Sequence, residues 1–135
     1  MNRRELLALS ASLTLLPFAS RAGDATLYSP GSAEAAMDAG KVVLLDFWAS
    51  WCSTCAAQER VLSELKAENP AYEQKIAFFI VDWDEYGKAE LSKALKIPRR
   101  STLVALKGRT ELGRIVAGTS KADIKALLDQ ALAAA

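Results

Sequence analysis

Apolar positions along the chain follow two patterns, continuous runs typical of buried strands and the spaced repeat of amphipathic helices. The runs KVVLLDF and IAFFIV favour central strands that are covered on both faces. The predicted elements, in chain order, are a short edge strand at Thr26–Ser29, a helix at Ser32–Ala39, a strand at Lys41–Phe47, a helix at Cys52–Glu68, a strand at Ile76–Val81, a helix at Gly87–Lys96, strands at Thr102–Leu106 and Leu112–Val116, and a helix from Ser120 to Leu132. Because βαβ units pair parallel strands and the late hairpin adds antiparallel ones, this order predicts an α/β fold. Its mixed central sheet would have helices on both faces.

Residues that begin and end helices support these boundaries. Ser32 and Ser120 are expected N-caps, the second in a capping box with Asp123. Gly40 is expected to end the first helix, and Pro70 is expected to stop the long one. A chain of 135 residues suits one core, so we expect a single domain over 23–135.

Residues 1–22 have the pattern of an export signal. Arg3 and Arg4 form a basic start, Leu6–Phe18 is apolar, and small residues precede a predicted cleavage after Ala22. The apolar stretch is too short and too interrupted for a stable membrane span. The paired arginines also resemble a twin-arginine export signal. The alternative is an amphipathic N-terminal helix of a cytosolic protein.

Composition narrows the chemistry. Seventeen basic and 16 acidic residues give a net charge of +1, without the clustered basic excess that nucleic acids or anionic membranes require. The 51% hydrophobic and 24% charged shares are those of a soluble globular protein. The chain has two cysteines and no histidine, which excludes a disulfide-rich scaffold and any mechanism with a histidine base.

The two cysteines, Cys52 and Cys55, lie between a predicted buried strand and an amphipathic helix. The first turn of a helix offers unpaired N–H groups and a partial positive charge, which would stabilise a thiolate at Cys52 and lower its pKa. The spacing of two residues brings Cys55 within one turn, where it could resolve a mixed disulfide. The pair therefore predicts thiol–disulfide exchange.

Two other uses of a CxxC pair stay open. A tetrahedral zinc site needs four ligands, so a metal or cluster would require carboxylates or a second subunit that brings its own cysteine pair. A purely structural disulfide is less favoured, because so short a loop removes little entropy from the unfolded chain.

The stretch VLLDFWASWCSTC resembles the active-site signature of the thioredoxin family, and the resemblance extends from about Lys41 to Leu132. It implies the thioredoxin-like fold and disulfide exchange without a bound cofactor. By this resemblance Cys52 would be the attacking thiolate, Cys55 the buried resolving thiol, and Asp46 a buried carboxylate that assists proton transfer. A strand-end aspartate in solvent is the alternative for Asp46.

The resemblance also implies a surface where substrate binds. Trp51 would flank the cysteines as part of this docking surface, and Gly118 resembles the glycine of the family near the substrate groove. Alignment of the Thr102–Leu106 strand places Ser101 where the family has a cis-proline, so Ser101 is a further expected substrate-binding residue. Since a non-proline cis peptide costs about 2.5–4 kcal/mol, we predict a trans bond before Ser101, unless a register shift gives Pro98 that role.

Other departures from the family change the expected chemistry. Ser-Thr separates the cysteines instead of Gly-Pro, and we expect a reductant or a moderate exchanger. Arg99 and Arg100 would make the rim of the site basic, or would be two solvated loop residues. Ile80 stands where many thioredoxins have a lysine near the buried aspartate, so burial should raise the pKa of Asp46 further. Arg60 replaces a helix-kinking proline.

The resemblance to exported thioredoxins implies a periplasmic reductant that acts on protein thiols and disulfides. A membrane thiol-transport protein would supply its electrons, and we expect a monomer that binds no nucleic acid. The alternatives are the metal-binding dimer described above and a catalytically weak binding module on the same fold, which the absent proline favours.

Overall fold

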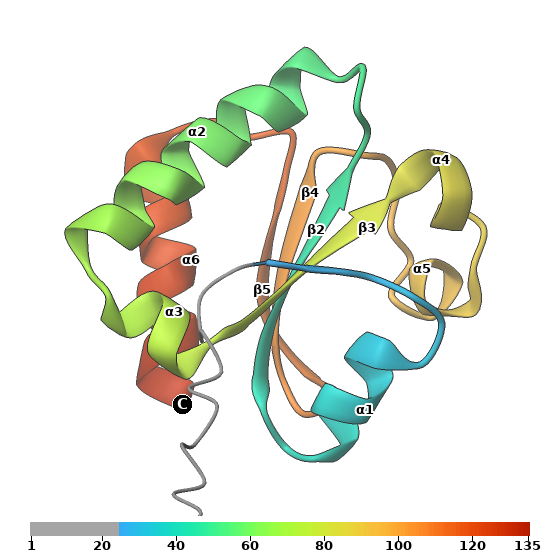
Figure 1. Ribbon diagram of the computed structural model, residues 1–135, viewed down its shortest axis with the longest axis horizontal. Helices are drawn as coiled ribbons and strands as arrows, with labels where there is room; N and C mark the ends of the chain where they lie inside the picture. Colours follow the sequence, from blue (N-terminus) through green and yellow to red (C-terminus); the bar gives the residue numbers. More distant parts are fainter. Residues whose placement is uncertain (1–24) are drawn as a thin grey trace, which may run out of the picture.

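The computed structural model describes residues 25–135, so the predicted signal at 1–22 lies outside the described residues. Five strands form one mixed sheet in the order β1-β3-β2-β4-β5 (Figure 1). The strands are β1 (Thr26–Leu27), β2 (Val42–Trp48), β3 (Ala77–Asp82), β4 (Thr102–Lys107) and β5 (Thr110–Val116). β3 pairs in parallel with β1 and β2, whereas β4 pairs antiparallel with β2 and β5. The predicted mixed sheet is confirmed.

Helices cover both faces of this sheet, as Figure 1 shows. One layer contains α2, α3 and α6, and the other contains α1, α4 and α5. The helices are α1 (Ser32–Asp38), α2 (Ser53–Glu68), α3 (Ala71–Lys75), α4 (Trp83–Tyr86), α5 (Glu90–Ala94) and α6 (Lys121–Ala134). Within residues 25–135, no helix has the length and apolar character that crossing a bilayer requires.

The central strand β2 divides the core between these two layers. Val42 and Leu44 pack in the cluster that includes α2 and α6, and Val43 and Leu45 pack in the cluster that includes α1. Because successive side chains of a strand point to opposite faces, Asp46 shares the face of Leu44 and points toward α2. The strand therefore places a carboxyl group beneath the helix that carries the cysteines.

Helix caps follow the sequence in part. The Ser120 hydroxyl accepts a hydrogen bond from the backbone N–H of Asp123 at 3.3 Å and begins α6, as predicted. The N-cap prediction for Ser32 is wrong, because Gly31 takes that position and the Ser32 hydroxyl donates to the carbonyl of Ser29 at 2.8 Å. Gly40 adopts the left-handed conformation that ends a helix, with φ 75°.

Two short helices were not expected from the sequence. Pro70 follows the end of α2, but its φ of −59° is already helical, and α3 begins directly after it. The predicted helix Gly87–Lys96 is wrong in extent, since α4 precedes Gly87 and α5 covers only the later part. The Asp82 carboxylate accepts from the backbone N–H of Asp84 at 3.0 Å, which starts α4 directly at the end of β3.

Candidate active site

Cys52 is the N-cap residue of α2. Its backbone is extended, with φ −90° and ψ 110°, and its Sγ accepts a hydrogen bond from the backbone N–H of Cys55 at 3.2 Å. A sulfur atom thus occupies the position that a serine or aspartate oxygen takes in an ordinary cap. The unpaired N–H groups and the positive end of the helix dipole favour a negative charge on this sulfur.

The two sulfurs differ in their protonation. Both cysteines are free thiols, Cys52 with 5% of its surface exposed and Cys55 with none. Burial acts to raise the pKa of Cys52, but hydrogen bonds from Cys55, Ser101 and Arg100 outweigh burial and lower it from 9.0 to about 7. Burial and the hydrogen bond to Cys52 raise the pKa of Cys55. Near neutral pH the pair therefore consists of a partly ionised Cys52 and a protonated Cys55.

Ser101 brings a hydroxyl group between the two sulfurs. Its Oγ lies 3.0 Å from Sγ of Cys52 and 3.2 Å from Sγ of Cys55. The residue is fully buried, and its backbone is also engaged, since its N–H donates to the carbonyl of Phe47 at 2.7 Å and its carbonyl accepts from the N–H of Ala117 at 2.8 Å. The side chain at the expected cis-proline position is thus a hydrogen-bonding partner of both cysteines. Its predicted contact with substrate stays a prediction.

The peptide bond before Ser101 is trans, as are all peptide bonds within residues 25–135. This confirms the predicted trans bond. Ser101 instead adopts a left-handed backbone, with φ 60°, which costs a non-glycine residue some strain. Pro98 is exposed and precedes this turn by three residues, so it does not take the cis-proline role.

Gln58 is a site residue that our sequence analysis did not single out. Its side chain is fully buried, and its Nε2 donates to the carbonyl of Ser101 at 3.0 Å and to the carbonyl of Gly118 at 2.9 Å. It therefore joins the two loops that border the cysteines. A signal was present, because Gln58 is a polar residue within the helical series Cys55, Leu62 and Leu65 that forms the buried side of α2.

We expect Gln58→Leu to lower the free energy of unfolding by about 1–3 kcal/mol, because the Gly118 carbonyl loses this donor and the Ser101 carbonyl keeps only the N–H of Ala117. Chemical denaturation monitored by tryptophan fluorescence measures this change. Gln74→Leu, at an exposed position of α3, is the matched control and should change stability by less than about 0.5 kcal/mol. Equal stability of the two variants would contradict the bridging role of Gln58.

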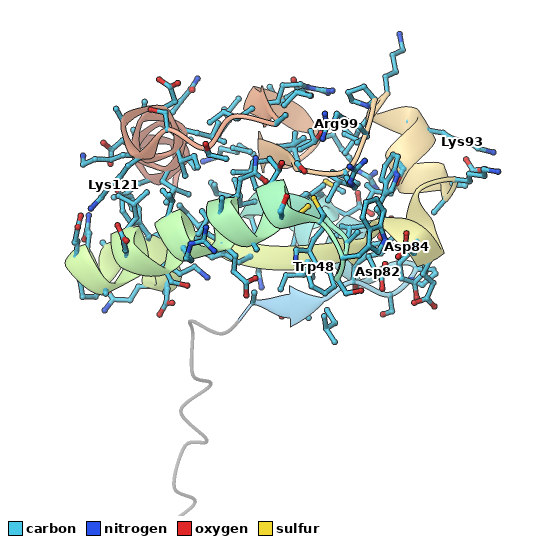
Figure 2. The ribbon with its side chains drawn as sticks, turned by 90° about the horizontal axis from the view of Figure 1, so that it is seen from above. Trp48, Asp82, Asp84, Lys93, Arg99 and Lys121 are labelled. Atoms are coloured by element: carbon cyan, nitrogen blue, oxygen red, sulfur yellow. The ribbon has the colours of Figure 1, made fainter. Side chains whose placement is uncertain are left out.

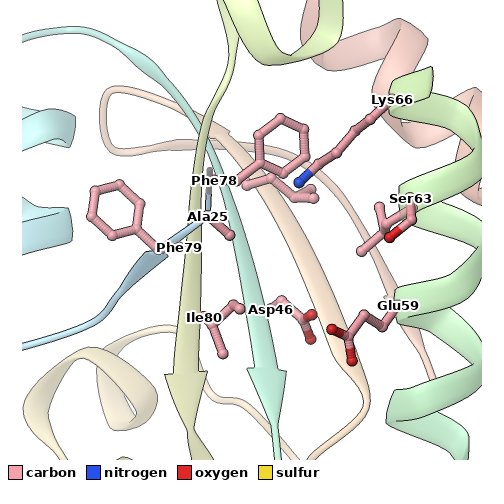
Figure 3. Close-up of a pocket in the computed structure, with 10 residues that line it drawn as sticks. Ala25, Asp46, Glu59, Ser63, Lys66, Phe78, Phe79 and Ile80 are labelled. Carbon is pink, nitrogen blue, oxygen red and sulfur yellow. The ribbon is translucent and has the colours of Figure 1, made fainter. Parts of the chain in front are cut away.

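Asp46 lies in a pocket of about 90 Å³ between the sheet and α2 (Figure 3). Only 7% of its surface is exposed, which rules out the alternative of a solvent-facing aspartate. Burial, with a smaller contribution from Glu59, raises the pKa of Asp46 to about 7, and Lys66 opposes this rise. Figure 3 shows the carboxylates of Asp46 and Glu59 directed toward one another. β3 has Ile80 where many thioredoxins have a lysine, but Lys66 of α2 places a cation in the same pocket.

Trp51 directly precedes Cys52 and is largely exposed to solvent. Its side chain is 59% exposed, and its Nε1 donates to Oδ2 of Asp84 at 2.8 Å. The Arg100 guanidinium stacks over the indole, 4.3 Å from the ring centroid. Figure 2 shows Asp84 at this end of the molecule and Lys121 at the other. Arg100 is half-buried, so it is not a solvated loop residue, and its neighbour Arg99 donates to the Arg100 carbonyl.

Within residues 25–135 no group of three or more His, Cys, Asp and Glu side chains is arranged to hold a metal ion. Both sulfurs lie within hydrogen-bond distance of the Ser101 hydroxyl, and Sγ of Cys52 also accepts from the backbone N–H of Cys55. The arrangement can generate a thiolate, present it beside an exposed tryptophan and keep a second thiol protonated behind it. That is the chemistry of a redox-active cysteine pair on a thioredoxin-like fold.

Comparison with known proteins agrees with this class. The family model described as Thioredoxin matches residues 32–130. The chain is 36% identical over 81 residues to a thioredoxin H-type of Fagopyrum esculentum, a match that covers 60% of this chain and 65% of that relative. It is 30% identical over 95 residues to a thioredoxin of Echinococcus granulosus, covering 70% of this chain and 82% of that protein. The chain belongs to the thioredoxin family.

A solved structure gives the same result. The crystal structure of Trxlp from Edwardsiella tarda EIB202 superposes with a TM-score of 0.68 at 31% sequence identity, covering 78% of this chain and 98% of that one. The chain spans slightly less than two thirds of the length of the Fagopyrum relative. The family and the fold are therefore established.

Proposed function

We propose that this protein is a thiol–disulfide oxidoreductase that reduces disulfides of other proteins through Cys52 and Cys55. The observation that carries the proposal is the Cys52 sulfur at the N-cap of α2, which has a hydrogen bond from a backbone N–H and a hydroxyl partner at 3.0 Å. The lowered pKa of this thiol supplies a substantial thiolate population at neutral pH.

The reaction has two exchange steps. The Cys52 thiolate attacks one sulfur of a substrate disulfide, forms a mixed disulfide and releases the other substrate sulfur as a thiolate that takes a proton. Cys55 then loses its proton and attacks Sγ of Cys52, which forms the Cys52–Cys55 disulfide and releases the second substrate thiol. The substrate disulfide gains two electrons, and the protein loses two.

Asp46 supports the second step as a proton acceptor. A pKa of about 7 lets its carboxyl group exchange a proton near physiological pH, and it lies on the face of β2 that points toward α2. Ser101 supports both steps, since one hydroxyl near both sulfurs can donate to whichever of them carries the charge.

We further propose that the protein works in the periplasm as a monomer without a bound cofactor. The basic start, the apolar stretch and the small residues before the predicted cleavage support export. Its electrons would come from a membrane thiol-transport protein, since an oxidising compartment offers no soluble reducing pool. Trp51 and Gly118 would border the docked substrate, with Ser101 between them and the cysteines.

Measurement of the midpoint potential of the Cys52–Cys55 couple, together with insulin disulfide reduction, tests this function. For a reductant we expect insulin reduction and a potential near the value of about −270 mV found for thioredoxin. A potential above about −180 mV would identify an oxidant or isomerase and overturn the proposed direction. Absence of any insulin reduction, with metal present in anaerobically purified dimer, would favour the metal-binding alternative.

A further inference from the structure

Arg100 occupies an unusual position for a charged surface residue. It directly precedes Ser101, whose hydroxyl contacts both sulfurs, and its guanidinium is stacked on Trp51, the residue before Cys52. Its Nε is buried and has no hydrogen-bond partner among the described residues. The side chain is therefore held in place by the tryptophan ring rather than by an ion pair through Nε.

The indole beneath Arg100 is itself fixed. Trp51 Nε1 donates to Asp84 of α4, the helix that follows β3, so a second segment of the chain holds the ring. A guanidinium over a tryptophan face is attracted by the ring quadrupole, and its flat shape allows close stacking. Three separate segments thus combine to hold one cation beside the reactive cysteine.

We propose that Arg100, held on the Trp51 ring, is the cation that helps to stabilise the Cys52 thiolate and raises its reactivity in this protein. The chain contains no histidine, so an imidazolium cannot take that role. The inference rests on the proposed exchange chemistry, because it assigns a residue to the attacking thiolate. Trp51 then acts as a positioning residue for Arg100, in addition to any contact with substrate.

The other groups around the Cys52 sulfur do not duplicate this positive charge. Cys55 of α2 is protonated and acts through its hydrogen bonds, and Asp46 of β2 is acidic. Asp84 of α4 is bonded to the indole. Of the charged groups identified at this site, Arg100 is the one that lowers the pKa of Cys52, through a side-chain hydrogen bond that adds to the larger contributions of Cys55 and Ser101. Removal of Arg100 should also make the couple more reducing, since the reduced form loses a stabilising contact.

The pH dependence of Cys52 alkylation by iodoacetamide tests the inference, with the labelled site confirmed by mass spectrometry. We expect Arg100→Gln to raise the pKa of Cys52 by about one unit, which lowers the alkylation rate at pH 6 roughly tenfold. Arg60→Gln removes an arginine from an exposed position of α2, the helix that Cys52 caps, and should change that rate less than about twofold. Arg100→Lys, which keeps the charge without the flat stack, should lie between the two.

A double-mutant cycle tests whether Trp51 acts on Cys52 by supporting Arg100 or through a separate effect of its own. We expect Trp51→Ala to slow alkylation at pH 6 about threefold, because Arg100 loses its support. The double variant of Trp51→Ala with Arg100→Gln should be no slower than Arg100→Gln alone. If Arg100→Gln does not fold, as judged by circular dichroism, the comparison of Trp51→Ala with the wild type decides.

The outcomes distinguish this inference from the proposed function. An unchanged alkylation profile in Arg100→Gln, or in Trp51→Ala where that variant decides, overturns the role of Arg100 even if insulin reduction is normal. If the effects of the two substitutions on the alkylation rate are fully additive in the double variant, Trp51 does not act by positioning Arg100. A wild type with a low Cys52 pKa that depends on Arg100 but without insulin reduction overturns the function and leaves the role of Arg100 intact.

Discussion

Replacement of Cys52 by serine is expected to reduce insulin disulfide reduction to the uncatalysed rate, a loss of roughly 10³-fold or more. A serine hydroxyl does not ionise near neutral pH, so the N-cap position and the Ser101 hydroxyl would have no thiolate to stabilise. Serine is itself a good N-cap residue, so α2 should form as before. Turbidity of reduced insulin with a small-molecule dithiol as electron donor measures the effect.

Cys55→Ser is the matched variant, because it removes the second exchange step and leaves the first. We expect this protein to attack substrate once and to accumulate as a mixed disulfide through Cys52, visible as a reducible adduct on a non-reducing gel. Cys52→Ser should form no such adduct. Catalytic turnover by Cys52→Ser, or an adduct through Cys55, would show that the attacking sulfur had been assigned wrongly.

Much of the fold could be predicted because its strands are encoded locally. KVVLLDF is apolar except for Lys41 and Asp46, and IAFFIV is apolar throughout. These runs became β2 and β3, and the capping box at Ser120 became the start of α6. Short elements were missed for a different reason. Pro70 follows the end of α2, and its own backbone already has the helical conformation that starts α3. The helix α4, which Asp82 caps, is a single turn, too short to show a hydrophobic period in the sequence.

The site was predictable where neighbours in sequence are neighbours in space. Cys52, Cys55 and Trp51 lie on one turn, so their placement followed from the strand–CxxC–helix order. Ser101 lies 49 residues from Cys52. Its contact with both sulfurs depends on its left-handed backbone conformation, which the local sequence does not predict. The half-burial of Arg100 likewise depends on the Trp51 ring, a contact between distant segments. Family resemblance located the Ser101 position but could not assign the atoms it touches.

Asp46→Asn is expected to stabilise the protein at alkaline pH and to slow its catalysis. The folded-state pKa of about 7 exceeds the ordinary value of 3.8, so the folded protein keeps a proton that the unfolded chain releases as pH rises between these values. The free energy of unfolding should therefore fall by about 4 kcal/mol from pH 4 to pH 7, and stay level above that range. An amide cannot ionise, so the variant should lack this fall and be more stable by about 2–4 kcal/mol at pH 8. The same change removes a proton acceptor and should lower turnover about 10²-fold at pH 7.

Denaturant unfolding of wild type and variant at several pH values distinguishes the buried carboxylate from a general packing effect of the substitution. A packing effect would shift stability by the same amount at every pH, whereas ionisation of Asp46 makes the difference grow between pH 4 and pH 7. Glu59→Gln provides the control, because Glu59 is exposed on α2 and raises the pKa of Asp46 only through its charge. Its removal should move the midpoint of the wild-type decline to lower pH and leave the decline itself in place. A wild type whose stability is constant across this range would mean that Asp46 titrates as a solvated aspartate, and its assignment as the proton acceptor for Cys55 would fail with it.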